Sequence, residues 1–338
     1  GDHRDLHYPL RRQRQMCIRD SNTVVLKPAT DTAFSGWLLA GCFRDAGLPD
    51  GVFNFVTGGG RTVGATIVDH PDIAGITFTG SYEVGMDIYR KFANGKYPRP
   101  CIAEMGGKNP AIISKKADLD KAALGVMRSA FGLQGQKCSA NSRVFVHDTV
   151  KEPFMEKLVN LTSEISVGDP SKRENWMGPV INKSAYDDYK RFVKDLAENG
   201  RIVYGGNVLE EGNGYYVEPT IVDQLPEDHA LWKQEMFLPI VTVAEFEDLD
   251  TAMARSNDVD YGLTAGFFSE DEEEQRWFLD NIEAGVVYVN RPAGATTGAW
   301  PGYQPFGGWK GSGSTGKAGG GRYYVQQYMH EQSQTVIS

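Results

Sequence analysis

Short β-rich runs alternate with amphipathic stretches along this chain, and no other feature of the sequence constrains the fold as strongly. The run TVVLKPA at 23–29 precedes a predicted helix over 31–47, and VFNFVTG at 52–58 precedes a second helix before the run IAGITFTG at 73–80. Strands that alternate with helices form a parallel sheet with crossover connections. The sequence therefore predicts an α/β fold.

A second α/β unit begins at CIAEMGGKNPAIIS (101–114), which predicts a strand, a glycine turn and another strand. Helices are predicted over 118–133, 152–164, 186–199 and 248–257. The aromatic-rich tail at 323–338 predicts a closing strand. The Gly-rich stretch at 298–321 is too long for a plain turn and indicates a functional loop.

Composition narrows the classes of protein that fit. With 338 residues the chain exceeds what one core usually holds, which predicts two domains. A net charge of −9 argues against a nucleic-acid or anionic-lipid surface as partner. The four cysteines form no CxxC pair, so we expect neither a disulfide framework nor a metal site. No apolar run is long enough to span a bilayer, and a cytoplasmic location is expected.

Two residues stand out as candidate catalytic groups. Cys138 in FGLQGQKCSANS follows a predicted helix among small neighbours, although a lone cysteine is more often a buried hydrophobe. Glu104 ends a predicted strand before two glycines, where it could activate a water, although an isolated glutamate is more often solvated. Their combination favours catalysis.

Six motifs in register carry a family resemblance: TVVLKPA, FTGSYEVG, EMGGK, GQKCSANSR, QEMFLPI and PFGGWKGSG. From Asn22 onward the chain resembles the aldehyde dehydrogenase superfamily. The resemblance implies that Cys138 is the nucleophile and Glu104 the general base. It also implies a Rossmann-type NAD-binding domain, truncated here, beside an α/β catalytic domain with a C-terminal strand tail.

The resemblance assigns cofactor contacts as well. Gly80 and Gly85 flank a strand-to-helix turn at which free backbone N–H groups and the Ser81 hydroxyl would receive a pyrophosphate, although plain helix entry is the commoner role of such a turn. The other implied contacts are Lys27 with the adenosine ribose, Glu235 with the nicotinamide ribose and Phe237 near the ring. NAD is expected. NADP stays open because Thr30 stands where many members carry a glutamate.

Within the superfamily, GQKCSA and TTGAWPGYQPFGG most resemble the L-glutamate γ-semialdehyde dehydrogenase subfamily. The resemblance implies that Gly298 and Ala299 use backbone N–H groups, together with Ser139, to grip a substrate carboxylate, and that Phe306 packs on the aliphatic chain. A flexible turn at Gly298 and a core role for Phe306 are the alternatives. Another semialdehyde or a betaine-type aldehyde also stays open as substrate.

The expected division is a non-core extension over 1–21, a partial dinucleotide-binding domain over 22–105, a catalytic domain over 106–300, and a substrate-loop return with an oligomerisation tail over 301–338. The resemblance implies that the family's upstream segment, with an asparagine of the oxyanion hole, has no counterpart here. We therefore expect poor NAD binding and slow turnover. The tail from Tyr323 to Val336 resembles the strand by which family members pair subunits, so a homo-oligomer is expected.

Two other functional classes stay open. A catalytically dead fragment could serve as a structural or interaction unit. A cysteine hydrolase without nicotinamide would need a histidine partner, and none of the six histidines lies in a convincing motif, with His147 and His229 expected at the surface.

Overall fold

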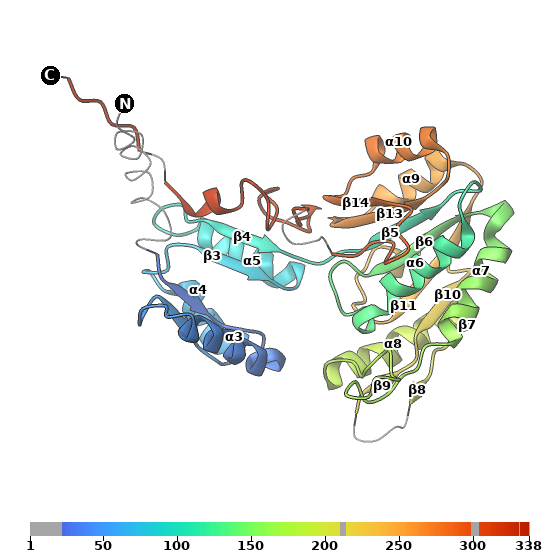
Figure 1. Ribbon diagram of the computed structural model, residues 1–338, viewed down its shortest axis with the longest axis horizontal. Coiled ribbons are helices and arrows are strands. Elements are labelled where there is room, and N and C mark those ends of the chain that lie inside the picture. Colours follow the sequence, from blue (N-terminus) through green and yellow to red (C-terminus); the bar gives the residue numbers. More distant parts are fainter. Residues whose placement is uncertain (1–21, 210–213, 299–303, 331, 338) are drawn as a thin grey trace. The chain divides into compact units, whose positions relative to one another are not determined.

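The computed structural model describes residues 22–209, 214–298, 304–330 and 332–337 (Figure 1). The predicted extension over 1–21 lies outside them. The chain divides into two compact units, of which the first comprises 1–78, 86–102 and 322–338 and the second 79–85 and 103–321. Each unit is described by itself below.

Two short sheets and their helices make up the first unit and its border. Strands β1 (Val24–Leu26) and β2 (Phe53–Phe55) pair in parallel through helix α3 (Ala33–Asp45), as the alternating pattern predicts. Strands β3 (Ile76–Thr79) and β4 (Cys101–Glu104) form a separate two-stranded sheet. The expected single sheet is thus two, and strands of three or four residues offer few ladder bonds to join them. The helical elements here are η1 (Thr30–Thr32), η2 (Gly60–Gly64), α4 (Ala65–Asp69) and α5 (Tyr82–Ala93).

A seven-stranded sheet forms the centre of the second unit, in the order β14-β13-β5-β6-β11-β10-β7. All neighbouring pairs are parallel except β10 and β7. Its strands are β5 (Asn109–Ile113), β6 (Asn141–His147), β7 (Arg201–Tyr204), β10 (Thr220–Asp223), β11 (Ile240–Phe246), β13 (Thr264–Phe268) and β14 (Val286–Val289).

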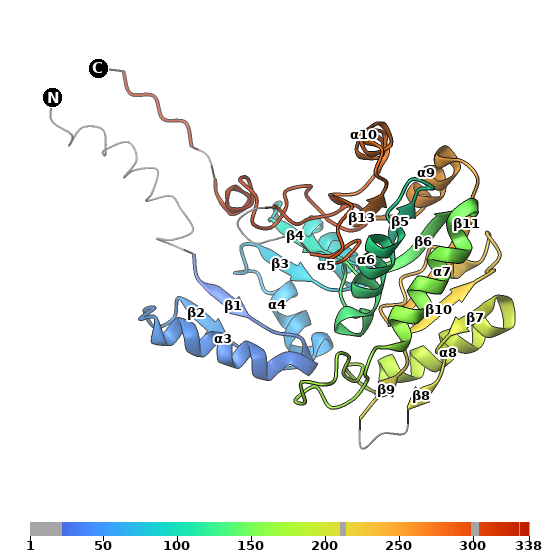
Figure 2. The same cartoon turned by 45° about the vertical axis from the view of Figure 1, so that its right-hand side comes forward.

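Both faces of this sheet are buried, because alternate residues of each strand point to opposite sides. Ala111 and Ile113 pack in one core with helices α6 (Leu119–Phe131) and α7 (Asp148–Ser163), which lie across the sheet in Figure 2. Ile112 packs in the other core with α8 (Lys183–Asn199), α9 (Leu249–Asn257) and α10 (Glu272–Asn281). The smaller elements are η3 (Gly132–Gly135), η4 (Ala230–Trp232), η5 (Val325–Tyr328), β8 (Val208–Leu209), β9 (Tyr216–Val217), β12 (Tyr261–Gly262) and β15 (Trp309–Lys310).

Two sequence expectations are wrong. The tail predicted as a strand forms the 3-10 helix η5, where the rings of Tyr324 and Tyr328 meet edge to face one turn apart, and its described residues pair with no strand. His147, expected at the surface, is buried at the end of β6, and its ring nitrogen caps α7 by accepting the Thr149 N–H. Helix α10 was not predicted, although Asp271 before an acidic first turn is a regular helix start.

Candidate active site

The chain reaches Cys138 through an unusual backbone turn. After α6, the residues Leu133, Gln134 and Gly135 all adopt left-handed conformations, with φ of 54°, 57° and 65°. Such a conformation costs a non-glycine residue on the order of 1–2 kcal/mol. At Gly135 a side chain would run into the Leu238 carbonyl. This turn places Cys138 just before β6, at the amino end of the seven-stranded sheet.

Cys138 is half-buried and carries a free thiol. Burial is the main cause that raises its pKa, and the carboxylates of Glu235 and Glu104 raise it further. The backbone N–H groups of Ser139 and of Cys138 itself act in the opposite direction, because they stabilise the thiolate. The sulfur therefore lies within electrostatic reach of both acidic side chains that the sequence assigned to this site.

Glu104 ends β4, and burial raises the pKa of its carboxyl group to about 7. Its Oε2 atom is buried and has no hydrogen-bond partner among the described residues. Its Oε1 atom lies 3.3 Å from the position that a β-carbon on Gly307 would occupy, in the predicted PFGG motif. A carboxyl group with this pKa can take up a proton near neutral pH, as a general base must.

The two glycines after Glu104 make room for a second carboxylate. The Gly107 N–H donates to Glu235 Oε1 at 2.9 Å. A side chain on Gly106 would overlap the Glu235 carboxylate. Burial raises the pKa of Glu235, which the Gly107 bond and nearby Lys108 partly offset. The motif EMGGK thus positions Glu104 directly and Glu235 through its backbone.

The described residues among the predicted substrate contacts all belong to the second unit, as Cys138 does. Ser139 is buried, and its Oγ lies 4.0 Å from where a β-carbon on Gly298 would stand. The Gly298 carbonyl accepts a hydrogen bond of 3.0 Å from the Tyr288 hydroxyl. Phe306 is half-buried and pairs with Gly319 through an isolated β-bridge. Ala299 lies outside the described residues.

The turn before α5 differs from its prediction. The Gly80 N–H is not free, since it donates to the Glu104 carbonyl at 3.1 Å. The Ser81 hydroxyl accepts the Val84 N–H at 3.4 Å, which is the helix-entry role of such a residue. Gly85 lies inside the first turn of α5 and donates to the Ser81 carbonyl. The turn is bonded to its own helix and to β4, and any pyrophosphate contact would have to use the remaining N–H groups.

Two further predicted contacts have distinct surroundings. Phe237 is 44% exposed and adopts a left-handed backbone with φ of 56°, a strained state for an aromatic residue. Lys27, in the first unit, donates through Nζ to the carbonyls of Pro28 at 2.6 Å and Gly58 at 3.1 Å. An exposed ring held in a strained conformation is a feature that functional sites tolerate.

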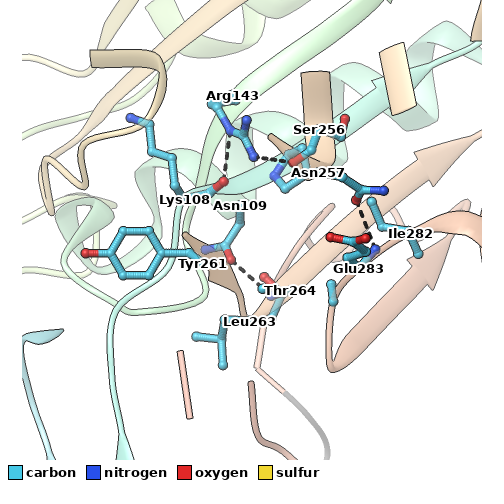
Figure 3. Close-up of a pocket in the computed structure, with 13 residues that line it drawn as sticks. Lys108, Asn109, Arg143, Ser256, Asn257, Tyr261, Leu263, Thr264, Ile282 and Glu283 are labelled. Atoms are coloured by element: carbon cyan, nitrogen blue, oxygen red, sulfur yellow. Dashed lines mark hydrogen bonds between the residues drawn. The ribbon is translucent and has the colours of Figure 1, made fainter. Parts of the chain in front are cut away.

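Sequence reasoning assigned no role to three buried polar residues, of which Lys108 ends the motif EMGGK, Asn109 follows it and Arg143 ends the motif GQKCSANSR. Lys108 is buried, and its pKa falls to about 7 chiefly because of that burial. Arg143 is also buried, and it donates to the carbonyls of Lys108 and Ser256, as drawn in Figure 3, and to that of Arg255. Asn109 bonds to the loop that carries Cys138. A polar residue inside a strand that is otherwise apolar was the available signal.

Comparison with known proteins identifies the family. Residues 12–334 match the model of the aldehyde dehydrogenase family. This chain belongs to the aldehyde dehydrogenase family. The match begins ten residues before Asn22, where the sequence motifs had placed the start of the resemblance.

Among the family's curated members, 1-pyrroline-5-carboxylate dehydrogenase of Bacillus mycoides is 40% identical over 323 residues, which are 94% of this chain and 61% of that protein. 1-Pyrroline-5-carboxylate dehydrogenase 1 of Halalkalibacterium halodurans is 39% identical over the same share of each chain. This aldehyde dehydrogenase family member thus spans about three fifths of the length of these curated relatives.

Solved structures agree on the fold. The Thermus 1-pyrroline-5-carboxylate dehydrogenase with bound NAD superposes with a TM-score of 0.87 at 36% identity, covering 93% of this chain and 60% of that one. Proline utilization A from Bdellovibrio bacteriovorus gives a TM-score of 0.86 at 40% identity, over 91% of this chain and 32% of that one. The aldehyde dehydrogenase fold is therefore shown. Among the described residues, no helix is both long and apolar enough to cross a membrane.

Proposed function

We propose that this chain carries the catalytic residues for oxidation of L-glutamate γ-semialdehyde to L-glutamate with NAD. One observation carries the proposal: the Glu104 carboxylate lies within electrostatic reach of the Cys138 sulfur, and both belong to motifs of the family. The relatives named 1-pyrroline-5-carboxylate dehydrogenase support the choice of substrate. Because the chain spans about three fifths of their length, activity, substrate and cofactor are proposals.

The residues divide the reaction into two halves. The Cys138 sulfur, as thiolate, forms a bond to the aldehyde carbon, and a hydride leaves that carbon, so that a thioester to Cys138 remains. Glu104 then takes a proton from a water, whose oxygen attacks the thioester carbon. The carbon–sulfur bond breaks, the free acid leaves, and the sulfur regains its starting state. The Cys138 backbone N–H can donate to the oxyanion of each tetrahedral intermediate.

The residues present fit a nicotinamide cofactor. The glycine pair at 106–107 leaves space that only glycine permits beside the Glu235 carboxylate, which suits two ribose hydroxyls as donors. The exposed Phe237 ring offers a flat apolar surface near it in sequence. When bound, NAD supplies the acceptor for the hydride. Glu235 and Phe237 would hold its nicotinamide end, and Lys27 would hold its adenosine ribose. The Ser81 hydroxyl hydrogen and the remaining N–H groups of the turn between Gly80 and Gly85 would hold its pyrophosphate.

We also propose a carboxylate-bearing aldehyde as the partner molecule, held by Ser139, Gly298 and Ala299, with Phe306 against its aliphatic chain. The approach of Ser139 Oγ to Gly298 supports this grouping. We propose a cytoplasmic location, which the free thiols of Cys42 and Cys138 support. The exposed apolar residues Val336 and Ile337 of the tail support a homo-oligomer, which sedimentation velocity would test.

Stopped-flow measurement of NADH absorbance tests the function. The protein is mixed with glutamate γ-semialdehyde and NAD, and we expect a burst of NADH that the Cys138→Ala variant lacks. Cys42→Ala, at an exposed thiol on α3, is the matched control and should keep the burst. A folded protein that gives no burst with this substrate, or an unchanged burst in Cys138→Ala, would contradict the proposal.

A further inference from the structure

The side chain of Asn109, at the start of β5, forms hydrogen bonds to the loop that carries Cys138. Its Nδ2 donates to the Cys138 carbonyl at 2.7 Å and to the Ala140 carbonyl at 2.8 Å. Its Oδ1 accepts the Thr264 N–H of β13 at 3.0 Å, a bond drawn in Figure 3. Asn109 is buried, and these three bonds use both amide hydrogens and the amide oxygen.

The surrounding backbone is built for this side chain. Pro110 follows Asn109 and has no N–H, and the β5–β6 register shifts between these two residues. The Asn109 amide thus bonds to backbone groups where the regular ladder is interrupted. A β-carbon on Gly107 would lie 2.6 Å from the Cys138 oxygen and 2.7 Å from Asn109 Oδ1, so glycine is required there as well.

The Cys138 carbonyl shares a peptide group with the Ser139 N–H. No described peptide bond is cis, and in a planar trans peptide the C=O and N–H point in opposite directions. Fixing the oxygen of this peptide therefore fixes the direction of the N–H. The Ser139 N–H is one of the two backbone N–H groups that lower the pKa of the Cys138 thiol. A donor on the oxygen side also polarises the peptide and strengthens its N–H as a donor.

We propose that Asn109 is a positioning residue for the nucleophile, which grips the Cys138–Ser139 peptide by its oxygen and so aims the Ser139 N–H at the Cys138 sulfur. The inference rests on the proposed function only in taking Cys138 as the nucleophile. Asn109 lies five residues after Glu104, so that one short segment carries the proposed base and also orients the peptide that stabilises the thiolate.

Three charged groups face the sulfur besides these N–H donors. Glu235 and Glu104 oppose the thiolate, and the Lys137 ammonium favours it. Substitution of Asn109 by serine changes none of these charges. It leaves a hydroxyl that donates one hydrogen bond and cannot reach both carbonyls and the Thr264 N–H together. A change in the thiol pKa of Asn109→Ser therefore reports the orientation of the peptide.

The test is the rate of Cys138 alkylation by iodoacetamide as a function of pH, followed on the Cys138 peptide by mass spectrometry. For Asn109→Ser we expect the midpoint of the profile to move upward by about one pH unit, equivalent to a roughly tenfold slower reaction near neutral pH. Asn257→Ser is the matched control, because Asn257 also bridges two backbone groups, the Asn281 carbonyl and the Glu283 N–H, and bonds neither Cys138 nor Ala140. Its pH profile should overlay that of the protein without a substitution.

If folded Asn109→Ser gives the same pH profile of alkylation as the protein without a substitution, the inference is overturned. If Asn109→Ser fails to fold by circular dichroism, Asn109→Thr replaces it, because threonine also keeps a single hydroxyl and adds no charge, and an unshifted profile there overturns the inference equally. Alkylation needs neither NAD nor aldehyde. If the profile of Asn109→Ser shifts but the protein makes no NADH, the role of Asn109 is supported and the proposed function is not. If the protein makes NADH but the profile does not shift, the proposed function is supported and the role of Asn109 is not.

Discussion

Helices α3 and α6 have the same length of 13 residues and very different surroundings. Helix α6 buries eight of its residues against the seven-stranded sheet, whereas α3 buries only Gly36 beside the two-stranded sheet of β1 and β2. Phe131 of α6 is 0% exposed and Phe34 of α3 is 70% exposed. Both helices are rich in apolar residues, so apolar content alone does not decide burial.

The difference shows what the sheet contributes. In the second unit, neighbouring parallel strands present a continuous apolar surface to α6 and α7. In the first unit, two strands of three residues cover little of α3. Cys138 and Glu104, the proposed catalytic residues, both belong to the second unit, where packing can hold side chains in fixed positions. Three matched pairs of variants test this contrast.

The largest effect is expected at the two phenylalanines. Phe131→Ala removes a fully buried ring and should lower the free energy of unfolding by about 3–5 kcal/mol. Phe34→Ala removes an exposed ring and should change it by less than about 0.5 kcal/mol. Urea unfolding followed by circular dichroism measures both. Equal losses would show that α3 is as well packed as α6.

Replacing one glycine by alanine in each helix should change the stability in opposite directions. A β-carbon on Gly125 of α6 would lie 2.7 Å from the Phe268 ring and 2.8 Å from the Arg291 carbonyl, so Gly125→Ala should destabilise by about 1–3 kcal/mol. Gly41 of α3 has no such neighbour within 3.4 Å, and Gly41→Ala should stabilise by about 0.5–1 kcal/mol. The two melting temperatures should move in opposite directions. A rise in both would remove the claim of tight packing around Gly125.

The smallest effect concerns the N-cap residue that precedes each helix. Asp118 caps α6 by accepting the Lys121 N–H at 3.1 Å, and Asp118→Ala should cost about 1 kcal/mol. Thr32 precedes α3 and makes no capping bond through its side chain, so Thr32→Ala should be nearly neutral. Thermal unfolding of the two variants checks this. A larger loss for Thr32→Ala would reverse the comparison.

The sequence predicted those helices and strands whose apolar residues recur with a regular period. Helices α6 to α9 and strands β1 to β5 follow hydrophobic periodicity and turn residues, and all were expected. Helix α10 was missed because a strongly charged first turn hides its apolar face. The tail at 323–338 was misread because aromatic residues favour strands only where a partner strand supplies the ladder.

For the site, the motifs predicted Cys138, Glu104 and Glu235 but not how they are held. Asn109 bonds a carbonyl 29 residues away, and such a bond leaves no periodic trace in the sequence. The bonds made by Gly80 and Ser81 show the converse. Their spacing predicted free groups, but the Gly80 N–H donates to β4 and the Ser81 hydroxyl accepts a bond from α5.

The measurement that tests the central claim most directly compares the NADH burst with the later steady rate in Glu104→Gln. If Glu104 and Cys138 act on one carbon, the burst remains and the steady rate falls by about 10²–10⁴-fold, because only thioester hydrolysis needs the base. The exposed Glu245→Gln should change neither.

The pH dependence sharpens the same experiment. Burial raises the pKa of Glu104 to about 7, so its basic form grows as pH rises through that value. The steady rate of the unmodified protein should therefore increase across neutral pH, and that of Glu104→Gln should lose this step. A Glu104→Gln protein with an unchanged steady rate, or one that loses the burst itself, would contradict a shared site for the carboxylate and the sulfur.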